Sequence, residues 1–519
     1  MLFNSYQFIF FFLPIVLIGF FVLGKRDKNT AALVWLVACS LFFYSWWNPI
    51  YLLLMLFSIL FNYLFGIILT KEDCGEKKRK YYLITGVALN IGLLGYFKYT
   101  NFFIDQINLA FDLSFHVEKI LLPLAISFFT FQQIAYLVDA YRRELKENNL
   151  LRYCLFVTFF PQLIAGPIVH HKEMLPQFKF AGIYQANARH IAIGLSIFAI
   201  GLFKKIVFAD NMAIHATPVF GAAEQYAVLT LFEAWGGALA YTAQLYFDFS
   251  GYSDMAIGLA YLIGIKIPIN FNSPYKSTSI IEFWRRWHMT LSRFLRDYLY
   301  FALGGNRKGN TRRYVNLFLT MVIGGIWHGA GWTFVIWGAL HGSYLMINHS
   351  WRKLRFGILN WNTDVGFVEM AVARFLTLLA VIIGWVYFRA ESIGGANHML
   401  LTMFGFYGVS LPSALQALIP NGFANYLIEM GIVFNGMFSG GSVIGAAGVN
   451  FGDSIKWILL LMLIAISAPN SQQLISRDQA SSQHILAKYP TIFGIIMGAI
   501  LFYVFINLQQ EAEFLYFNF

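Results

Sequence analysis

The chain has 519 residues, of which 58% are hydrophobic and 12% are charged, and its mean hydropathy is +0.60. Soluble globular domains are about 25% charged, so this composition excludes a soluble cytoplasmic enzyme. The apolar majority and the 3 cysteines also exclude a disordered or disulfide-stapled chain. The net charge of +11 comes without a long basic arm or a soluble domain, so nucleic-acid binding is not expected.

Long apolar runs organise the chain from its N-terminus, and a helix that spans a bilayer needs about 20 apolar residues. The first run, residues 7–23, has no charge before it and is followed directly by Lys25 and Arg26. A cleaved signal peptide has the opposite polarity. We therefore predict an uncleaved span with the N-terminus outside the membrane.

The remaining apolar runs predict an all-α polytopic membrane protein. They cover residues 32–46, 50–70, 81–98, 119–139, 150–168, 189–208, 227–247, 251–266, 315–346, 368–389, 456–468 and 490–507. Breaks around Pro161 and Gly166 suit re-entrant segments, which are tolerated inside a helical bundle. We expect about 11–13 transmembrane helices plus re-entrant and amphipathic helices, all within one integral-membrane domain over residues 1–519.

Two regions depart from this pattern. Residues 394–450 are rich in glycine and almost free of charge, which predicts a variable region of short helices and loops on the outer face. Residues 508–519 form an aromatic C-terminal tail that ends in FLYFNF. An aromatic belt at the membrane interface explains such a tail. The alternative is a terminal tyrosine that reaches back into the protein.

Basic residues gather in short loops, which the positive-inside rule places on the cytoplasmic side. These clusters are Lys25, Arg26 and Lys28; Lys77 to Lys80; Arg142, Arg143 and Lys146; Arg285, Arg286, Arg293 and Arg296; and Arg307, Lys308, Arg312 and Arg313.

No metal site is expected. Cys39, Cys74 and Cys154 lack metal-ligand spacing. The adjacent His170 and His171 would face apart in either a helix or a strand, so they do not make a ligand pair.

Residues 280–300 alternate arginines with Trp284, Trp287, Phe294 and Leu295, which predicts a basic, aromatic, amphipathic helix in the membrane interface. Within it, Arg285, His288 and Ser292 would share one helical face. Such a face would suit a tunnel for an anionic cofactor. The alternative is an interfacial histidine hydrated at the level of the lipid headgroups.

His328 is the sharpest candidate for chemistry. It lies in the motif GGIWHG (324–329), inside an apolar stretch where an ionisable residue is costly. The glycines permit close approach of a ligand or a neighbouring helix. A neutral imidazole can take a proton from a hydroxyl nucleophile at neutral pH. The alternative is a histidine satisfied by a hydrogen bond between helices.

Two further polar segments are weaker signals. Asp248 and Asp254 lie at the join of two apolar runs, which suggests a proton relay, an ion site or, as the favoured interpretation, capping of a following helix by Ser250, Ser253 and Asp254. The loop GGNRKG (304–309), with Asn306 and Arg307, could contact phosphates but lacks the P-loop spacing.

Several motifs in fixed order resemble the membrane-bound O-acyltransferases. They are QLYFDFSGYSDMAIG (244–258), EFWRRWHMTLSRFLRDYLY (282–300), GGNR (304–307), GGIWHGAGW (324–332) and GWVYFRA (384–390). The branch they resemble is the bacterial one that O-acetylates alginate, cellulose or peptidoglycan and is related to the D-alanyl exporter of teichoic acids. The resemblance runs to about Ala390 and resumes at residues 468–471 and the last helix.

The resemblance implies an O-acetyltransferase of the bacterial inner membrane that uses cytosolic acetyl-CoA as donor and holds no bound cofactor. His328 would be the catalytic residue and His288 its polar partner, both lining a central tunnel. The acceptor would be an envelope polysaccharide or peptidoglycan outside the membrane, reached through a periplasmic or membrane-anchored partner that resembles an acetyltransferase or esterase. Alginate, cellulose, peptidoglycan and other envelope glycans all fit.

Further roles follow from the same resemblance. The donor site and tunnel would include Trp284, Arg285, Ser292, Asn306, Arg307, Trp327 and Asp248. Cationic residues at the cytosolic mouth would attract the phosphates of CoA. The tail resembles a short aromatic motif in a small partner of the D-alanyl system, which makes Tyr516 a candidate acyl relay.

Two other functions remain open. A transporter or flippase for a glycan precursor would use Asp139, Asp248 and Asp254 as charges at the bilayer midplane, but we find no paired broken helices in two similar halves. A non-catalytic scaffold of an envelope-polysaccharide complex is the other alternative.

Overall fold

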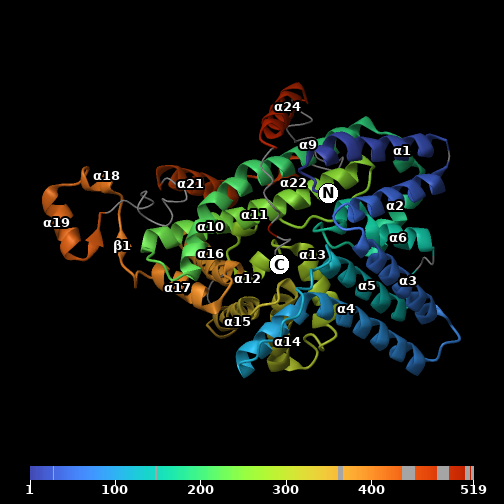
Figure 1. Ribbon diagram of the computed structural model, residues 1–519, viewed down its shortest axis with the longest axis horizontal. Coiled ribbons are helices and arrows are strands. Elements are labelled where there is room, and N and C mark those ends of the chain that lie inside the picture. Colours follow the sequence, from blue (N-terminus) through green and yellow to red (C-terminus); the bar gives the residue numbers. More distant parts are fainter. Residues whose placement is uncertain are drawn as a thin grey trace.

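The structure is a computed structural model, and it describes residues 1–26, 28–145, 149–359, 366–434, 451–475, 490–508 and 515. These residues are mostly helical (Figure 1). The strands among them are β1 (Val409–Ser410) and β2 (Ile432–Val433), which pair in parallel. The predicted all-α class is therefore confirmed.

The N-terminal part is a bundle of helices at one end of the molecule (Figure 1). A π-helical turn, Gln7–Phe12, leads into α1. The bundle contains α1 (Leu13–Lys25), α2 (Asn29–Ser45), α3 (Ile50–Thr70), α4 (Glu76–Phe111), α5 (Ile126–Tyr141), α6 (Leu150–Thr158) and α7 (Phe160–Leu163). α1 packs on α2, and α5 packs on both α3 and α4.

Two predicted apolar runs in this bundle are interrupted. The run 119–139 is helical only from Ile126, after the extended segment that contains Pro123, whose ring and missing N–H disfavour a helix interior. The run 150–168 breaks between α6 and α7 beside Pro161, as predicted.

A central layer follows. Short turns at Leu175–Lys179 and Ala181–Tyr184 follow α8 (His171–Met174). The layer then consists of α9 (Ala188–Phe203), a π-helical turn at Lys204–Ala209, α10 (Asp210–Glu224) and α11 (Leu231–Leu262).

α9 and α11 pack closely because glycines face each other. A Cβ on Gly194 would lie 2.8 Å from the carbonyl oxygen of Gly258, and one on Gly201 would lie 2.6 Å from that of Gly251. Small residues of this kind let helix backbones approach in membrane proteins.

The structure corrects two predictions in this layer. The runs 227–247 and 251–266 are one helix of 32 residues, α11, which begins with a capping box at Thr230 and Glu233. Ser253 and Asp254 therefore lie inside α11, and the capping interpretation is wrong. The predicted amphipathic interface helix over 280–300 is also wrong. The segment breaks into α12 (Ile280–Trp284), α13 (Met289–Phe294) and a π-helical turn at Leu295–Tyr300, and most of its aromatic residues are buried.

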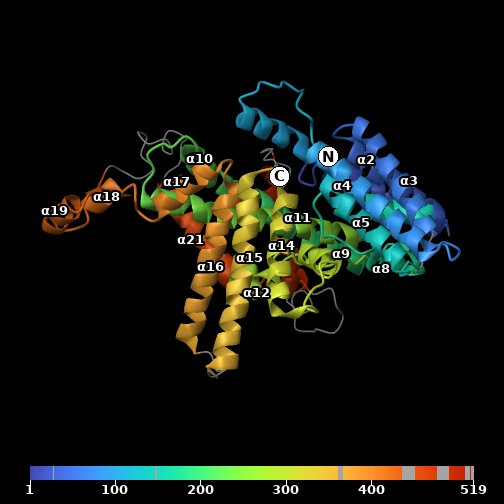
Figure 2. The same cartoon turned by 90° about the horizontal axis from the view of Figure 1, so that it is seen from below.

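The C-terminal half contains α14 (Gly309–His328), α15 (Trp332–Lys353) and α16 (Phe367–Arg389), which run side by side in Figure 2. The other elements are a 3-10 turn at Pro274–Lys276, a π-helical turn at Leu354–Ile358, α17 (Ile393–Met403), α18 (Ser413–Gln416), α19 (Asn421–Glu429), α21 (Phe451–Ser467), α22 (Ser471–Leu474) and α24 (Pro490–Ile506). α18 and α19 extend away from the helical body (Figure 1). Part of the predicted variable region, residues 435–450, lies outside the described residues.

Four helices in the described part of the chain are long and apolar enough to cross a membrane. They are Gln7–Lys25, Ile50–Thr70, Ala188–Glu224 and Phe367–Arg389. Others, such as α11 and α14, are long but carry buried polar side chains, so hydropathy alone does not identify them. The polytopic membrane class is confirmed.

Candidate active site

His328 occupies the last position of α14, where the helix stops at a glycine-rich break. The chain is extended at Gly329 and Gly331, and α15 begins at Trp332. A Cβ on Gly329 would lie 2.1 Å from the ring of Phe334, so only glycine fits this crossing. The apolar run predicted over 315–346 is therefore two helices, and the break between them places the imidazole at a helix end, where His328 is 6% exposed.

Lys98 of α4 caps this helix end. Its Nζ donates to the carbonyl oxygen of Trp327 at 2.6 Å and to that of His328 at 2.9 Å. The hydroxyl of the neighbouring Tyr99 donates to the carbonyl of Ile326. The last carbonyls of a helix lack intrahelical partners and carry partial negative charge, so a cation there is favourable.

Aromatic rings surround the His328 imidazole. Its ring centroid lies 5.0 Å from that of Trp327, 5.1 Å from Trp337 on α15 and 5.2 Å from Phe388 on α16. Trp327 in turn stacks on Phe131 of α5 at 4.6 Å. The imidazole is therefore held in an apolar site assembled from α5, α14, α15 and α16.

His288 lies beside His328, although it comes from a different segment. It precedes α13 in a left-handed conformation with φ of 40°, and it is 1% exposed. The centroids of the two imidazole rings are 6.4 Å apart. Nδ1 of His288 lies 3.0 Å from Oδ1 of Asn270. The His288 ring contacts the ring of Phe249 edge-on, with the centroids 4.7 Å apart. The structure brings the two predicted histidines together in the buried interior.

The residues predicted for the donor site and tunnel separate into three groups. Trp284 and Trp327 are buried; Trp327 contacts His328, and Trp284 contacts Trp337, whose ring also contacts His328. Ser292 is half-buried in α13, while Arg285, Asn306 and Arg307 are exposed.

Asp248 is buried in α11 and forms an ion pair with Lys205 at 2.8 Å. Its Oδ2 also accepts a hydrogen bond of 3.2 Å from the backbone N–H of Leu515 in the C-terminal tail. Tyr516 itself lies outside the described residues.

His341 of α15 is a third buried histidine that the sequence analysis did not predict. It is fully buried, and its Nδ1 accepts a hydrogen bond of 3.3 Å from Nε1 of Trp284. Its ring lies 5.0 Å from that of Trp337, which also contacts His328. The signal that could have found it is the one that found His328, an ionisable residue within an apolar helix.

The other candidate polar residues have protein partners. Asp139 accepts from Tyr298 at 3.1 Å, and Asp254 accepts from Lys204 at 2.7 Å and from Ser471 at 2.6 Å. His171 lies 3.4 Å from Asp139. Burial lowers the pKa of His171 to about 4, so its ring is neutral at pH 7 and this contact is not an ion pair.

Within the described residues, no group of three histidine, cysteine, aspartate or glutamate side chains is placed to hold a metal ion. His170 lies 3.1 Å from the hydroxyl of Tyr298, whereas His171 faces Asp139. The two adjacent histidines therefore have different partners.

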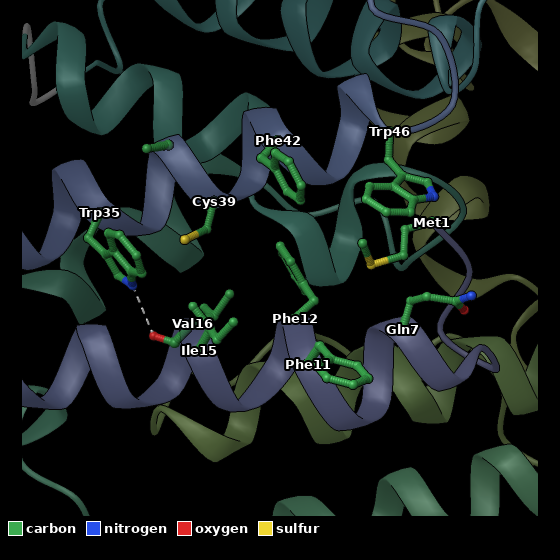
Figure 3. Close-up of a pocket in the computed structure, with 11 residues that line it drawn as sticks. Met1, Gln7, Phe11, Phe12, Ile15, Val16, Trp35, Cys39, Phe42 and Trp46 are labelled. Atoms are coloured by element: carbon green, nitrogen blue, oxygen red, sulfur yellow. Dashed lines mark hydrogen bonds between the residues drawn. The ribbon is translucent and has the colours of Figure 1, made fainter.

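Two of the cavities lined by described residues bear on where a ligand could bind. An apolar groove of about 530 Å³ separates α2 from the N-terminal helix, with Trp35, Cys39, Phe42 and Trp46 on one wall and Phe11, Phe12, Ile15 and Val16 on the other (Figure 3). None of the predicted site residues lines it. A polar pocket of about 10 Å³ lies next to Asn270 and is lined also by Lys204, Ser253, Asp254 and Ser471.

Comparison with known proteins gives a consistent assignment. Residues 32–362 match MBOAT, the membrane-bound O-acyltransferase family. The chain is 42% identical to the peptidoglycan O-acetyltransferase of Helicobacter pylori, across 100% of this chain and 98% of that protein. It is 43% identical to the probable alginate O-acetylase AlgI of Pseudomonas aeruginosa, across 78% of this chain and 75% of that protein.

A more distant relative is the teichoic acid D-alanyltransferase of Bacillus subtilis, which is 30% identical over 50% of this chain and 65% of that protein. The predicted resemblance and the predicted acyltransferase activity are confirmed. The chain belongs to the membrane-bound O-acyltransferase family.

Proposed function

We propose that this membrane protein transfers acetyl groups from cytosolic acetyl-CoA to peptidoglycan on the outer side of the bacterial inner membrane. The observation that carries the proposal is the buried pair of His288 and His328, whose rings lie 6.4 Å apart. The full-length match to a peptidoglycan O-acetyltransferase favours that acceptor over alginate, for which the match covers less of the chain.

In the proposed mechanism, His328 acts as the general base. It takes the proton from an acceptor hydroxyl as the hydroxyl oxygen attacks the thioester carbonyl, and the CoA sulfur leaves and receives the proton. The products are an ester and free CoA, so atoms and charge balance. General-base assistance contributes about 10²–10⁴-fold in rate. His288 either orients the reacting group or stabilises the oxyanion. A donor that stabilises the oxyanion lowers the activation free energy by roughly 3–4 kcal/mol.

Tyr516 is the proposed first acceptor. Its phenolic oxygen would take the acetyl group and pass it to a hydroxyl outside the membrane or to a periplasmic or membrane-anchored partner. Support comes from the neighbouring residue, because the Leu515 backbone is hydrogen-bonded to Asp248. Phe249, which follows Asp248 in α11, contacts the ring of His288. Leu515 is therefore bonded to the helix that also contacts one of the two histidines.

The proposed orientation places the N-terminus outside and the basic loops in the cytoplasm. Exposed cations such as Arg285 and Arg307 then lie where the phosphates of CoA would arrive.

Cells that produce wild-type protein or His328→Ala in place of the native copy test this proposal. The measurement is base-labile acetate on isolated peptidoglycan and on secreted polysaccharide, with the protein level in membranes determined in parallel. We expect acetate on peptidoglycan with wild-type protein and its loss with His328→Ala at an equal protein level. Normal acetylation with His328→Ala would favour the scaffold alternative. Acetate on secreted polysaccharide alone would identify a different acceptor.

A further inference from the structure

Asn270 makes a set of hydrogen bonds that determines which nitrogen of His288 carries the proton. Asn270 lies between α11 and α12 and is 1% exposed. Its Oδ1 accepts from the backbone N–H of Thr290 at 3.3 Å and from the hydroxyl of Thr290 at 2.8 Å. Since a backbone N–H can only donate, the atom of Asn270 that faces it must be the amide oxygen.

The same oxygen lies 3.0 Å from Nδ1 of His288. An amide oxygen accepts and cannot donate, so Nδ1 must be the donor in this contact. A neutral imidazole has one N–H and one lone pair, so Nε2 then carries the lone pair. We propose that Asn270 is a positioning residue that holds His288 in the Nδ1–H tautomer, with Nε2 as a hydrogen-bond acceptor beside His328.

The backbone around these residues supports a fixed geometry. The N–H of Met289 donates to the carbonyl oxygen of Asn270 at 2.9 Å, and the N–H of Asn272 donates to that of Arg286 at 2.9 Å. The segments on either side of His288 and Asn270 are therefore paired through backbone as well as side chains. His288 itself adopts a left-handed conformation, which is uncommon outside glycine and is retained only where surrounding contacts determine it.

The proposal rests on the proposed function and separates the two roles considered for His288. In this tautomer Nδ1 of neutral His288 carries the proton and donates a hydrogen bond to Asn270. Nε2 can then accept a hydrogen bond but cannot donate one. His288 can thus accept a hydrogen bond from a donor group of the bound substrate, but it cannot stabilise an oxyanion through Nε2. Since the single proton of the reacting hydroxyl goes to His328, His288 positions the bound substrate beside His328 through another donor group of that substrate.

The amide nitrogen of Asn270, Nδ2, has a separate contact that provides a matched control variant. This nitrogen donates to Oγ of Ser253 at 3.3 Å, on the side of the polar pocket with Asp254 and Lys204. Ser253→Ala removes this contact and leaves the acceptor oxygen of Asn270 in place. Asn270→Leu removes the acceptor, whereas the nearly isosteric Asn270→Asp keeps it and adds a negative charge.

The first measurement is the ¹⁵N NMR spectrum of the full-length protein with labelled histidine, in detergent. His288→Gln identifies the signals of His288 among the 11 histidines. We expect a protonated Nδ1 and an unprotonated Nε2 for His288 in wild-type protein and in Ser253→Ala. In Asn270→Leu we expect this pattern to be lost. A protonated Nε2 in wild-type protein would overturn the proposal, and this result does not depend on catalysis or on the identity of the donor.

The second measurement is the pH profile of CoA release from acetyl-CoA. Asn270→Leu should lower kcat about tenfold or more with little change in KM, because orientation of a bound group is lost. In Asn270→Asp the carboxylate favours the charged imidazolium of His288. The acid limb of the profile should therefore move to higher pH in this variant, with more activity retained than in Asn270→Leu.

Ser253→Ala should behave as wild type in this assay. A purely structural role would lower activity in both Asn270 variants without moving the acid limb, and that result would overturn the proposal. If Asn270→Leu does not fold, the direction of the shift in Asn270→Asp decides the question alone. If wild-type protein releases no CoA while the NMR pattern is as expected, the proposed function fails and the assignment of the tautomer stands.

Discussion

The Nζ of Lys98 lies 2.9 Å from the carbonyl oxygen of His328, across 230 positions of sequence. The same ammonium lies 2.6 Å from the carbonyl oxygen of Trp327. Lys98 is 9% exposed, so these two carbonyl oxygens accept hydrogen bonds that water would accept from an exposed lysine. One buried lysine thus ties α4 to the end of α14 that carries the candidate base.

Replacing Lys98 by methionine should leave two carbonyl oxygens at the end of α14 without their donor. A hydrogen bond to a charged group is worth about 1.5–3 kcal/mol, and a displacement of about 1 Å at a reacting group can cost about 10²-fold in rate. We therefore expect turnover by Lys98→Met to fall by one to two orders of magnitude, with partial recovery in Lys98→Arg.

The matched control is Tyr99→Phe, which removes only the neighbouring hydrogen bond to Ile326 and should have a smaller effect. The measurement is CoA release at equal amounts of folded protein, checked by gel filtration. Wild-type turnover in Lys98→Met would show that this contact does not position His328.

His288→Ala should reduce turnover less than His328→Ala does, because His288 orients the reacting group and does not accept its proton. The expected losses are about 10²–10⁴-fold for His328→Ala and a smaller factor for His288→Ala. Steady-state kinetics of CoA release would measure both. An unchanged rate in His288→Ala would remove His288 from the active site, although it lies beside His328.

The tail gives a separate prediction. If Tyr516 carries the acetyl group, Tyr516→Phe should abolish acceptor acetylation and the stable label that radioactive acetyl-CoA leaves on the protein. Tyr503→Phe, at an exposed position of α24, is the control and should keep both. The label would be located by mass spectrometry of proteolytic peptides. Acceptor acetylation at the wild-type rate in Tyr516→Phe would end the relay hypothesis.

The predicted orientation can be tested with a native cysteine. α4 has 36 residues, which corresponds to about 54 Å and exceeds the bilayer core of about 30 Å. We therefore predict that its two ends lie on opposite sides of the membrane. Cys74 precedes α4 in a loop predicted to be cytoplasmic, and Val117 lies in the exposed segment beyond the other end.

In a background of Cys39→Ala and Cys154→Ala, a membrane-impermeant maleimide should label Cys74 only after the cells are permeabilised. In a variant that also carries Cys74→Ala and Val117→Cys, the same reagent should label intact spheroplasts. Labelling of Cys74 in intact spheroplasts would reverse the orientation and place the basic loops outside.

The sequence predicted those structural features that depend on residues adjacent in the chain. The glycines around His328 permit close approach of a neighbouring helix, and a Cβ on Gly325 would lie only 3.1 Å from Cα of Gly338 in α15. The proline at 161 predicts the interruption of its apolar run, which the structure confirms. His328 was predicted as an ionisable residue inside an apolar stretch, and His288 as a member of the polar face of an arginine-rich segment.

Other features depend on contacts between distant segments, which no local pattern contains. Asp254 resembles a helix cap by composition, but α11 continues through it because Lys204 and Ser471 satisfy its carboxylate from two other elements. The segment around His288 has the periodicity of one amphipathic helix. Its pairing with residues 270–272 breaks that helix and buries it. Lys98 and Asn270 were missed for the same reason.

The most direct test of the central claim uses purified protein in detergent with radiolabelled acetyl-CoA, comparing wild type, His328→Ala and His190→Ala. His190 is a half-buried histidine at the start of α9, where it packs on Tyr261, and it serves as the matched control. The account predicts CoA release by wild type and by His190→Ala, and a loss of about 10²-fold or more in His328→Ala. Equal release by wild type and His328→Ala would contradict it.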